Sequence, residues 1–291
     1  MRIRLVALLL LPAAVACSSS TQAPDSSKAP AITQNAQGQA ITLAQARAKL
    51  ARISPKKTQL WVVVHIRAHK HLLEDGTVDE ARLIEGALSD ADAVVRGGGD
   101  AIILINSRAE MPVYERVITA VRKRHPEFPL GISALAYGPK NLTEGFRLAK
   151  KYNAQVVWCE VVPDELIEYE EDEGKFTPAE VIPRAFALEV QNEVKPDAMH
   201  IAGVHMKYTR PLDGLSLPEA IQRALGSVDA INITGPKTGV RADTERVRIA
   251  REAAGEWPMG LASGVSAENV GAILQYIDYA IVGTSLKVPG N

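Results

Sequence analysis

Short runs of branched apolar residues alternate along most of the chain with longer stretches whose apolar residues recur every three or four positions. Such unbroken apolar runs are typical of parallel strands buried on both faces, and the stretches between them have the period of amphipathic helices. The runs predict eight strands, at residues 60–66, 101–106, 130–135, 155–161, 199–204, 230–234, 259–263 and 279–283. Helices are predicted between them, for example at 78–96, 114–124, 141–152, 178–192 and 244–254.

Even spacing of the strands indicates how they are arranged. One strand begins about every 28 residues, which is the repeat of a βα unit, and eight such units form a (β/α)8 TIM barrel in the α/β class. An open doubly wound sheet is the alternative, but it gives no reason for eight even units. The sequence therefore predicts a closed barrel with its active-site end at the carboxyl ends of the strands.

The eighth helix of such a barrel is missing, because few residues follow Gly283. A helix at 43–53, with Thr42 and Gln45 as a capping box, precedes the first strand. We expect this helix to take the place of the eighth, in the gap between the eighth and first strands. The other interpretation is that the carboxyl end of the chain is truncated.

The first residues are typical of an export signal. Arg2 and Arg4 precede an apolar run at 5–11 that is too short to span a bilayer. The Ala-Val-Ala-Cys sequence ending at Cys17 resembles a bacterial lipobox, which implies lipidation of Cys17, although an ordinary signal peptide with a chance cysteine is the alternative. Ser18 implies, again by resemblance, sorting to the outer membrane. We therefore expect a cell-envelope protein that is lipid-anchored to a bacterial membrane.

Three segments follow from these patterns: a signal peptide at 1–17, a linker at 18–40 and the barrel at 41–291. The linker is rich in Ser, Pro, Gln and Ala and has almost no large apolar residues, so it cannot bury enough surface to fold.

The net charge of −1 argues against non-specific nucleic-acid binding. Two cysteines, Cys17 and Cys159, do not form a disulfide framework. The oligomeric state stays open, with a homo-oligomer one possibility.

Polar residues end most of the predicted strands. Their convergence on one mouth favours a functional site there, and the alternative is that barrel mouths are polar because they meet water. In chain order the strand ends are His65, Asn106, Ser133, Glu160, His205, Thr234, Ser263 and Gly283.

The turns after strands seven and eight are the usual phosphate site of this fold. Glycines there let main-chain amides approach an anion. We expect a small anionic or phosphorylated ligand, and the alternative is two tight turns without a ligand. The predicted phosphate-binding residues are Thr234, Gly235, Ser263, Gly264, Val265, Gly283 and Thr284.

Three side chains are candidates for catalysis. His65 would be a general base near neutral pH, and His205 and Lys207, two residues apart on one strand, would point the same way. Either histidine is as easily a structural hydrogen-bonding group, whereas a lysine inside a barrel mouth needs an anionic partner. His69 and His71 imitate a metal motif, but its partners after strands six and eight are absent, so neither a metal nor a cofactor is expected.

Three segments resemble the BtpA family: Thr-Gly-Pro-Lys-Thr-Gly at 234–239, Ser-Gly-Val-Ser-Ala-Glu-Asn at 263–269 and Val-Gly-Thr-Ser-Leu-Lys at 282–287. The resemblance extends over about 60–287, includes the histidine that ends the first strand, and implies a phosphate-binding TIM barrel of the ribulose-phosphate-binding type. The namesake of the family is linked to photosystem I biogenesis.

This chain departs from the family pattern at two strand ends. An arginine after the third strand is replaced by Ala136, an aspartate after the fifth by Gly203 and a histidine by Tyr208. Loss of these charges favours a ligand-binding protein with a role in membrane-complex biogenesis, or a non-catalytic protein-interaction scaffold. The enzyme alternative is a lyase, isomerase or hydrolase acting on a sugar-phosphate-like substrate.

Overall fold

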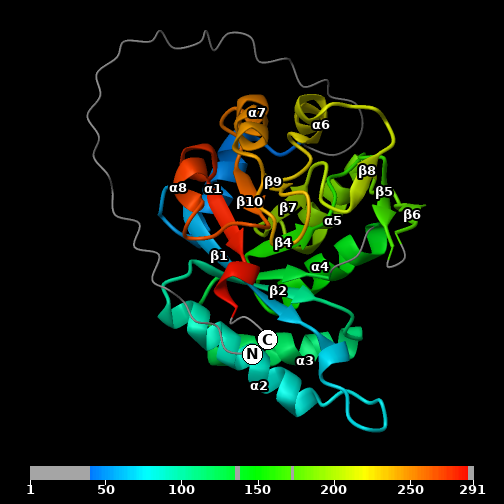
Figure 1. The fold of residues 1–291 in the computed structure, drawn as a ribbon, viewed down its shortest axis with the longest axis vertical. Coiled ribbons are helices and arrows are strands. Elements are labelled where there is room, and N and C mark those ends of the chain that lie inside the picture. Colours follow the sequence, from blue (N-terminus) through cyan, green and yellow to red (C-terminus); the bar gives the residue numbers. More distant parts are fainter. Residues whose placement is uncertain (1–39, 135–137, 172–173, 288–291) are drawn as a thin grey trace.

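Eight parallel strands close into a barrel in the computed structural model, which describes residues 40–134, 138–171 and 174–287. Their order around the barrel is β1-β11-β10-β9-β7-β4-β3-β2 (Figure 1). The predicted (β/α)8 barrel is confirmed, and an open sheet is excluded because β1 pairs with both β2 and β11. The barrel strands are β1 (Gln59–Ile66), β2 (Ala101–Asn106), β3 (Leu130–Ser133), β4 (Val156–Cys159), β7 (Met199–Gly203), β9 (Ala230–Thr234), β10 (Met259–Ala262) and β11 (Tyr279–Val282).

Helices surround the ring of strands, with α6 and α7 on one side and α2 and α3 on the opposite side (Figure 1). They bury their apolar stripes against the outward-facing residues of the strands. In the described part of the chain β11 is followed by a 3₁₀ turn and no α-helix. The helices are α1 (Leu43–Ile53), α2 (Glu80–Arg96), α3 (Met111–Arg124), α4 (Pro139–Lys151), α5 (Arg184–Val194), α6 (Leu217–Ala224), α7 (Thr244–Ala254) and α8 (Val270–Ile273), with 3₁₀ turns η1 (Ala68–Lys70), η2 (Leu274–Tyr276) and η3 (Thr284–Leu286).

Helix α1 lies under the amino-terminal end of the barrel, so the prediction that it fills a gap between the eighth and first strands is wrong. Leu50 and Ile53 instead join the apolar cluster of the barrel interior. Lys49 Nζ lies 2.9 Å from a carboxylate oxygen of Asp229, at the start of β9. The open end of the barrel offers the apolar stripe of α1 a place to be buried.

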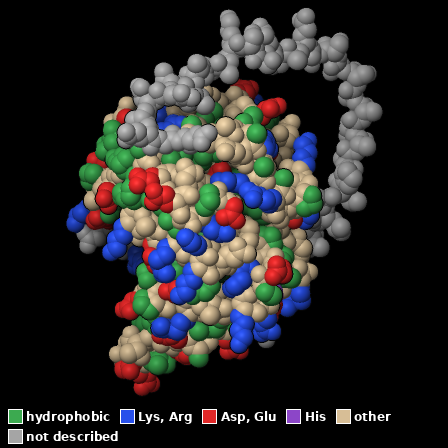
Figure 2. All heavy atoms as spheres, turned by 180° about the vertical axis from the view of Figure 1, so that it is seen from behind, with side chains coloured by type: hydrophobic (Ala, Val, Ile, Leu, Met, Phe, Trp, Pro, Cys, Tyr) green, Lys and Arg blue, Asp and Glu red, His purple; other side chains and the backbone are tan. Residues whose placement is uncertain are grey.

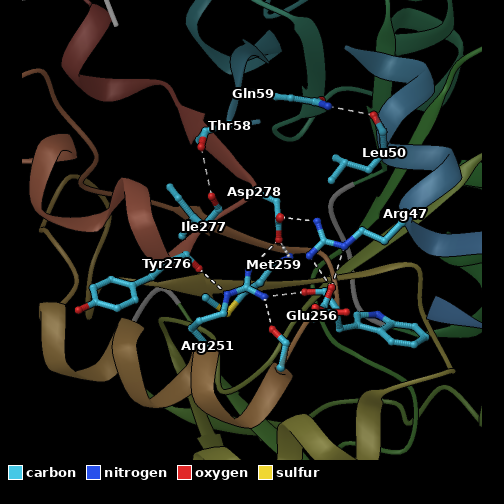
Figure 3. A network of polar contacts seen from close by, with 12 residues as sticks. Arg47, Leu50, Thr58, Gln59, Arg251, Glu256, Met259, Tyr276, Ile277 and Asp278 are labelled. Atoms are coloured by element: carbon cyan, nitrogen blue, oxygen red, sulfur yellow. Dashed lines mark hydrogen bonds and ion pairs between the residues drawn. The ribbon is translucent and has the colours of Figure 1, made fainter. Parts of the chain in front are cut away.

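A half-buried carboxylate anchors this end of the molecule. Asp278, directly before β11, receives hydrogen bonds from the guanidinium groups of Arg47 and Arg251 and from the amide of Met259 (Figure 3). The predicted capping box of α1 is also present, with the Gln45 amide donating to Thr42 Oγ1 at 3.2 Å. Together these contacts fix α1 as the closed floor of the barrel.

Aromatic rings fill the lower half of the barrel interior. Trp61 and Tyr279 stack with ring centroids 4.0 Å apart, and Tyr279 donates a 2.6 Å hydrogen bond to Asn232 Oδ1. Gly260 makes room for this ring, since a Cβ there would lie closer than 3.0 Å to it. The carboxyl-terminal half of the interior remains for a cavity.

A small antiparallel sheet, in the order β6-β5-β8, was not predicted from the sequence. It consists of β5 (Ile167–Glu170), β6 (Phe176–Pro178) and β8 (Thr209–Pro211). The predicted helix at 178–192 begins only at Arg184, because β6 extends to Pro178 and Pro183 lies at the helix cap.

Charged side chains of both signs are interspersed on the face of the molecule in Figure 2. None of the helices among the described residues is long and apolar enough to cross a bilayer. The signal peptide, the lipidation site Cys17 and all of the linker except residue 40 lie outside the described residues.

Candidate functional site

A cavity of about 370 Å3 opens at the carboxyl ends of the barrel strands. This volume is in the range of small-molecule sites. Its deeper wall is apolar, and its rim comes from the loops after β7, β9, β10 and β11. The deeper wall consists of Val63, Ile105, Trp158, Ala262 and Ile281, and the remaining lining residues are His65, Lys207, Thr238, Gly239, Arg241, Ser263, Gly264, Val265, Ser266, Asn269, Gly283, Thr284 and Ser285.

The turns after β10 and β11 meet at this cavity, as the sequence predicts. Ser285 Oγ donates a 2.7 Å hydrogen bond to the carbonyl of Val265, which ties one turn to the other. Within the described residues, no hydrogen bond uses the main-chain amides of Gly264 and Val265. Of the predicted phosphate-binding residues, the cavity is lined by Ser263, Gly264, Val265, Gly283 and Thr284.

Gly264 has a steric reason to be glycine. Its φ is +69°, and a Cβ would lie closer than 3.0 Å to the main chain of Val240 and Arg241. The loop after β9 therefore packs directly on the turn after β10. This contact places Arg241 at the rim of the cavity.

Thr234 and Gly235, the other two predicted phosphate-binding residues, do not line the cavity. Thr234 Oγ1 accepts a 2.9 Å hydrogen bond from the amide of Lys207. A Cβ at Gly235 would lie closer than 3.0 Å to the carbonyl of Val240. Both residues therefore shape the loops that form the rim.

Lys207 and Arg241 bring positive charge to a cavity that has no acidic lining residue. Lys207 Nζ lies 2.9 Å from Ser263 Oγ and 3.1 Å from Thr238 Oγ1. These partners are neutral hydroxyls, and no carboxylate of the described residues lies within ion-pair distance of either cation. The site therefore has the charge to hold an anion.

His65 lines the cavity as a neutral ring. Lys287 Nζ lies 3.0 Å from its Nδ1. Burial, together with the charges of Lys287, Arg67 and Lys207, lowers the pKa of His65 to about 3. Burial also lowers the pKa of Lys287 to about 8, so this amine is mostly protonated at neutral pH and donates to Nδ1. The ring proton then resides on Nε2, which makes His65 a hydrogen-bond donor toward a ligand.

His205 lies away from the cavity. The strand alternation that predicts a common direction for His205 and Lys207 ends with β7 at Gly203, and His205 has a φ of +46°. Its amide donates a 3.0 Å hydrogen bond to Glu165, whose pKa burial raises to about 7. The side chain of Glu165 is buried, although carboxylates are usually exposed to solvent. Its role is to hold the turn that carries Lys207.

The departures from the family pattern have a partial structural explanation. A Cβ at Gly203 would lie closer than 3.0 Å to the side chain of Met206, which occupies the space of the missing aspartate. Tyr208 accepts a 3.0 Å hydrogen bond from the amide of Thr238 and so supports the rim. Ala136 lies outside the described residues.

Several lining residues were not predicted from the sequence. Arg241, Asn269 and Thr238 lie on the loops after β9 and β10, whose paths depend on the close contact of Gly264 with the main chain of Val240. Strand alternation in β4 could have predicted Trp158, because its neighbour Cys159 faces the helices and Trp158 must then face the barrel interior. Cys159 packs as an apolar residue, and burial raises the pKa of its thiol to about 12. Among the described residues, no three His, Cys, Asp or Glu side chains are grouped as a metal site requires.

Comparison with known proteins places this site in a family. A sequence model described as the BtpA family matches residues 56–291. An uncharacterized protein of Archaeoglobus fulgidus is 28% identical over 229 residues, which cover 73% of this chain and 85% of that protein. The photosystem I biogenesis protein BtpA of Synechocystis is 32% identical over 106 residues, covering 36% of this chain and 37% of that protein.

Solved structures share the barrel. N-acetylneuraminate lyase from Mycoplasma synoviae has a TM-score of 0.55 at 13% identity, covering 81% of this chain and 72% of that chain. The corresponding lyase from Fusobacterium nucleatum has a TM-score of 0.51 at 12% identity, covering 79% and 71%. At these identities the similarity extends to the fold.

Proposed function

We propose, from the premise that this chain belongs to the BtpA family, that its barrel binds a phosphorylated or other anionic small metabolite in the mouth cavity. The observation that carries the proposal is the composition of the cavity lining, which contains Lys207 and Arg241 and no carboxylate. Lys207 is half-buried and Arg241 is exposed, and partial burial makes a cation without an anionic partner less favourable. An anion between the two side chains would supply that partner.

The glycine turns support the same ligand. Gly264 and Gly283 carry no side chain that would keep an anion away from the main chain, and both line the cavity. Hydroxyl groups of Ser263 and Thr238 already accept hydrogen bonds from Lys207 and are free to donate to ligand oxygens. Charged, hydroxyl and amide donors around one cavity are the groups that bind a phosphate.

Binding is favoured over turnover. His65 is held as a neutral donor, and the nearby Glu160, whose pKa burial raises, does not line the cavity. A lyase or isomerase often uses a carboxylate for proton transfer. Among the described residues, no carboxylate lines the cavity. A binding role therefore agrees best with the residues at the mouth.

Membrane attachment through Cys17 is the second part of the proposal, and a role in membrane-complex biogenesis follows the name of the Synechocystis relative. The predicted linker joins the barrel at α1, under the end opposite to the cavity. A lipid anchor at Cys17 would thus leave the mouth accessible. Cell fractionation tests this: the Cys17→Ser protein should leave the membrane fraction, and unchanged fractionation would remove the anchor from the account.

Thermal unfolding in the presence of inorganic phosphate or ribose 5-phosphate tests the cavity. A ligand at a hundredfold excess over its Kd stabilises the native state by about 2.7 kcal/mol, which raises the Tm of a domain of this size by about 5–10 °C. The shift should be lost in Lys207→Met and Arg241→Ala. Lys237→Ala is the matched control, because Lys237 is an exposed cation of the same loop that does not line the cavity.

If neither compound shifts the Tm of the unaltered protein, the binding proposal fails. If Lys237→Ala abolishes the shift as completely as Arg241→Ala, binding is a non-specific charge effect and the cavity is not the site.

A further inference from the structure

The wall of the cavity holds a hydrogen-bond donor without a partner. We propose that the ligand is an organic phosphate whose non-phosphate end carries oxygen acceptors, and that the indole N–H of Trp158 and the imidazole N–H of His65 recognise those oxygens. This inference rests on the proposed function and identifies the class of ligand.

Trp158 carries the inference. Its side chain is 7% exposed and lines the cavity, and its Nε1 is buried with no hydrogen-bond partner among the described residues. Buried indole N–H groups usually have a partner. Trp61, deeper in the same barrel, follows this rule, because its Nε1 donates a 2.9 Å hydrogen bond to Gln59 Oε1. Trp257 Nε1 is also buried without a partner among the described residues, but Trp257 lies outside the cavity, so of these two donors only that of Trp158 belongs to a residue that a ligand in the cavity could contact.

His65 supplies a second donor from across the barrel. Strands β1 and β4, which carry the two residues, are separated by β2 and β3 along the shorter path around the ring. Lys287 Nζ occupies the Nδ1 side of His65 at 3.0 Å. The other ring nitrogen then carries the proton, and no described side chain accepts it. The two N–H groups thus belong to residues that line the same cavity from nearly opposite walls.

The size and lining of the cavity fix the rest of the ligand. A volume of about 370 Å3 corresponds to about a dozen water molecules at about 30 Å3 each, which is more than one phosphate group occupies. Apolar side chains of Val63, Ile105 and Ile281 line the wall near the two donors. A short carbon skeleton fits against them. The inferred ligand is therefore a phosphorylated polyol or oxo compound with its phosphate at the glycine turns.

Calorimetric titration with a set of phosphates tests the inference. Inorganic phosphate probes the rim alone, propyl phosphate adds a carbon skeleton without acceptors, and glycerol 3-phosphate and ribose 5-phosphate add acceptor oxygens. We expect the last two compounds to bind about 5- to 100-fold more tightly than propyl phosphate, the range for one or two buried hydrogen bonds. Trp158→Phe should reduce this preference by at least fivefold and leave the affinity for inorganic phosphate within twofold.

Matched variants separate recognition from packing. Trp257→Phe makes the same chemical change at a buried tryptophan outside the cavity, and it should leave the preference unchanged. His65→Gln retains an N–H donor and His65→Leu removes it, so the first should keep more of the preference than the second. Circular dichroism and the Tm of each variant establish that it is folded.

The outcomes are distinguishable from those of the binding proposal. If none of the phosphates binds, the proposed function fails and this inference with it. If inorganic phosphate binds but propyl phosphate is bound as tightly as glycerol 3-phosphate and ribose 5-phosphate, the inference is overturned while the anion site stands. The same holds if Trp158→Phe lowers the affinity for all four compounds equally.

Discussion

The contact between Gly264 and the loop after β9 leads to the most detailed prediction. Replacing Gly264 by alanine puts a Cβ on a residue with a φ of +69°, at less than 3.0 Å from main-chain atoms of Val240 and Arg241. Left-handed backbone costs a non-glycine residue about 1–2 kcal/mol, and forced repacking adds about 1–3 kcal/mol. Gly264→Ala should therefore destabilise the protein by about 2–5 kcal/mol and displace Arg241 from the rim.

Two other glycines separate these effects. Gly214 also has a positive φ, of +70°, but a Cβ there meets no atom within 4 Å, so Gly214→Ala measures the backbone strain alone. Gly271, in α8, has open space and no positive φ, and Gly271→Ala should stabilise the protein by up to about 1 kcal/mol.

Urea unfolding gives the three free energies, and calorimetry with inorganic phosphate gives the affinity. We expect Gly264→Ala to lose more stability than Gly214→Ala and, alone of the three variants, to lose phosphate affinity. Such comparisons resolve differences of about 0.5 kcal/mol. If the two variants Gly264→Ala and Gly214→Ala lose the same free energy of unfolding within that limit, and Gly264→Ala still binds phosphate normally, the packing of the two loops does not form the site.

Three further predictions concern other parts of the molecule. Lys287 has a pKa lowered to about 8, so phosphate affinity, measured by calorimetry from pH 7 to 9.5, should fall above pH 8 more steeply than in Lys287→Met. Burial lowers the pKa of His200 to about 3, so only the unfolded chain takes up its proton between pH 6.5 and 3, and stability falls as pH falls; urea unfolding should show this fall reduced by about 1.4 kcal/mol per pH unit in His200→Leu. Leu50→Ala should cost about 2–5 kcal/mol in urea unfolding without changing phosphate affinity, because α1 closes the opposite end of the barrel; a loss of affinity would contradict this separation.

The barrel was predictable because each strand is a short apolar run and each helix an amphipathic stretch, at even spacing. The place of α1 was not, because its capping box and apolar stripe fit either a gap in the ring or the floor of the barrel. The packing of Leu50 and Ile53 with the barrel interior decides between them. The sheet of β5, β6 and β8 was not predicted, because its strands are short and pair residues that are distant in sequence.

The candidate site was predictable where it depends on strand ends and glycine turns. Ser263, Gly264 and Gly283 all line the cavity, as does Lys207. His205 was misplaced because strand alternation does not extend past the end of β7. Arg241 was missed because its position depends on the packing of one loop on another.

The most direct test of the anion site is a crystal structure of the protein with arsenate, a phosphate analogue whose arsenic is located by anomalous scattering. One anomalous peak should lie in the cavity, within hydrogen-bond distance of the turns after β10 and β11 and beside Lys207 and Arg241. Arsenate bound only on the outer surface, at a concentration that protects the protein against unfolding, would contradict the account.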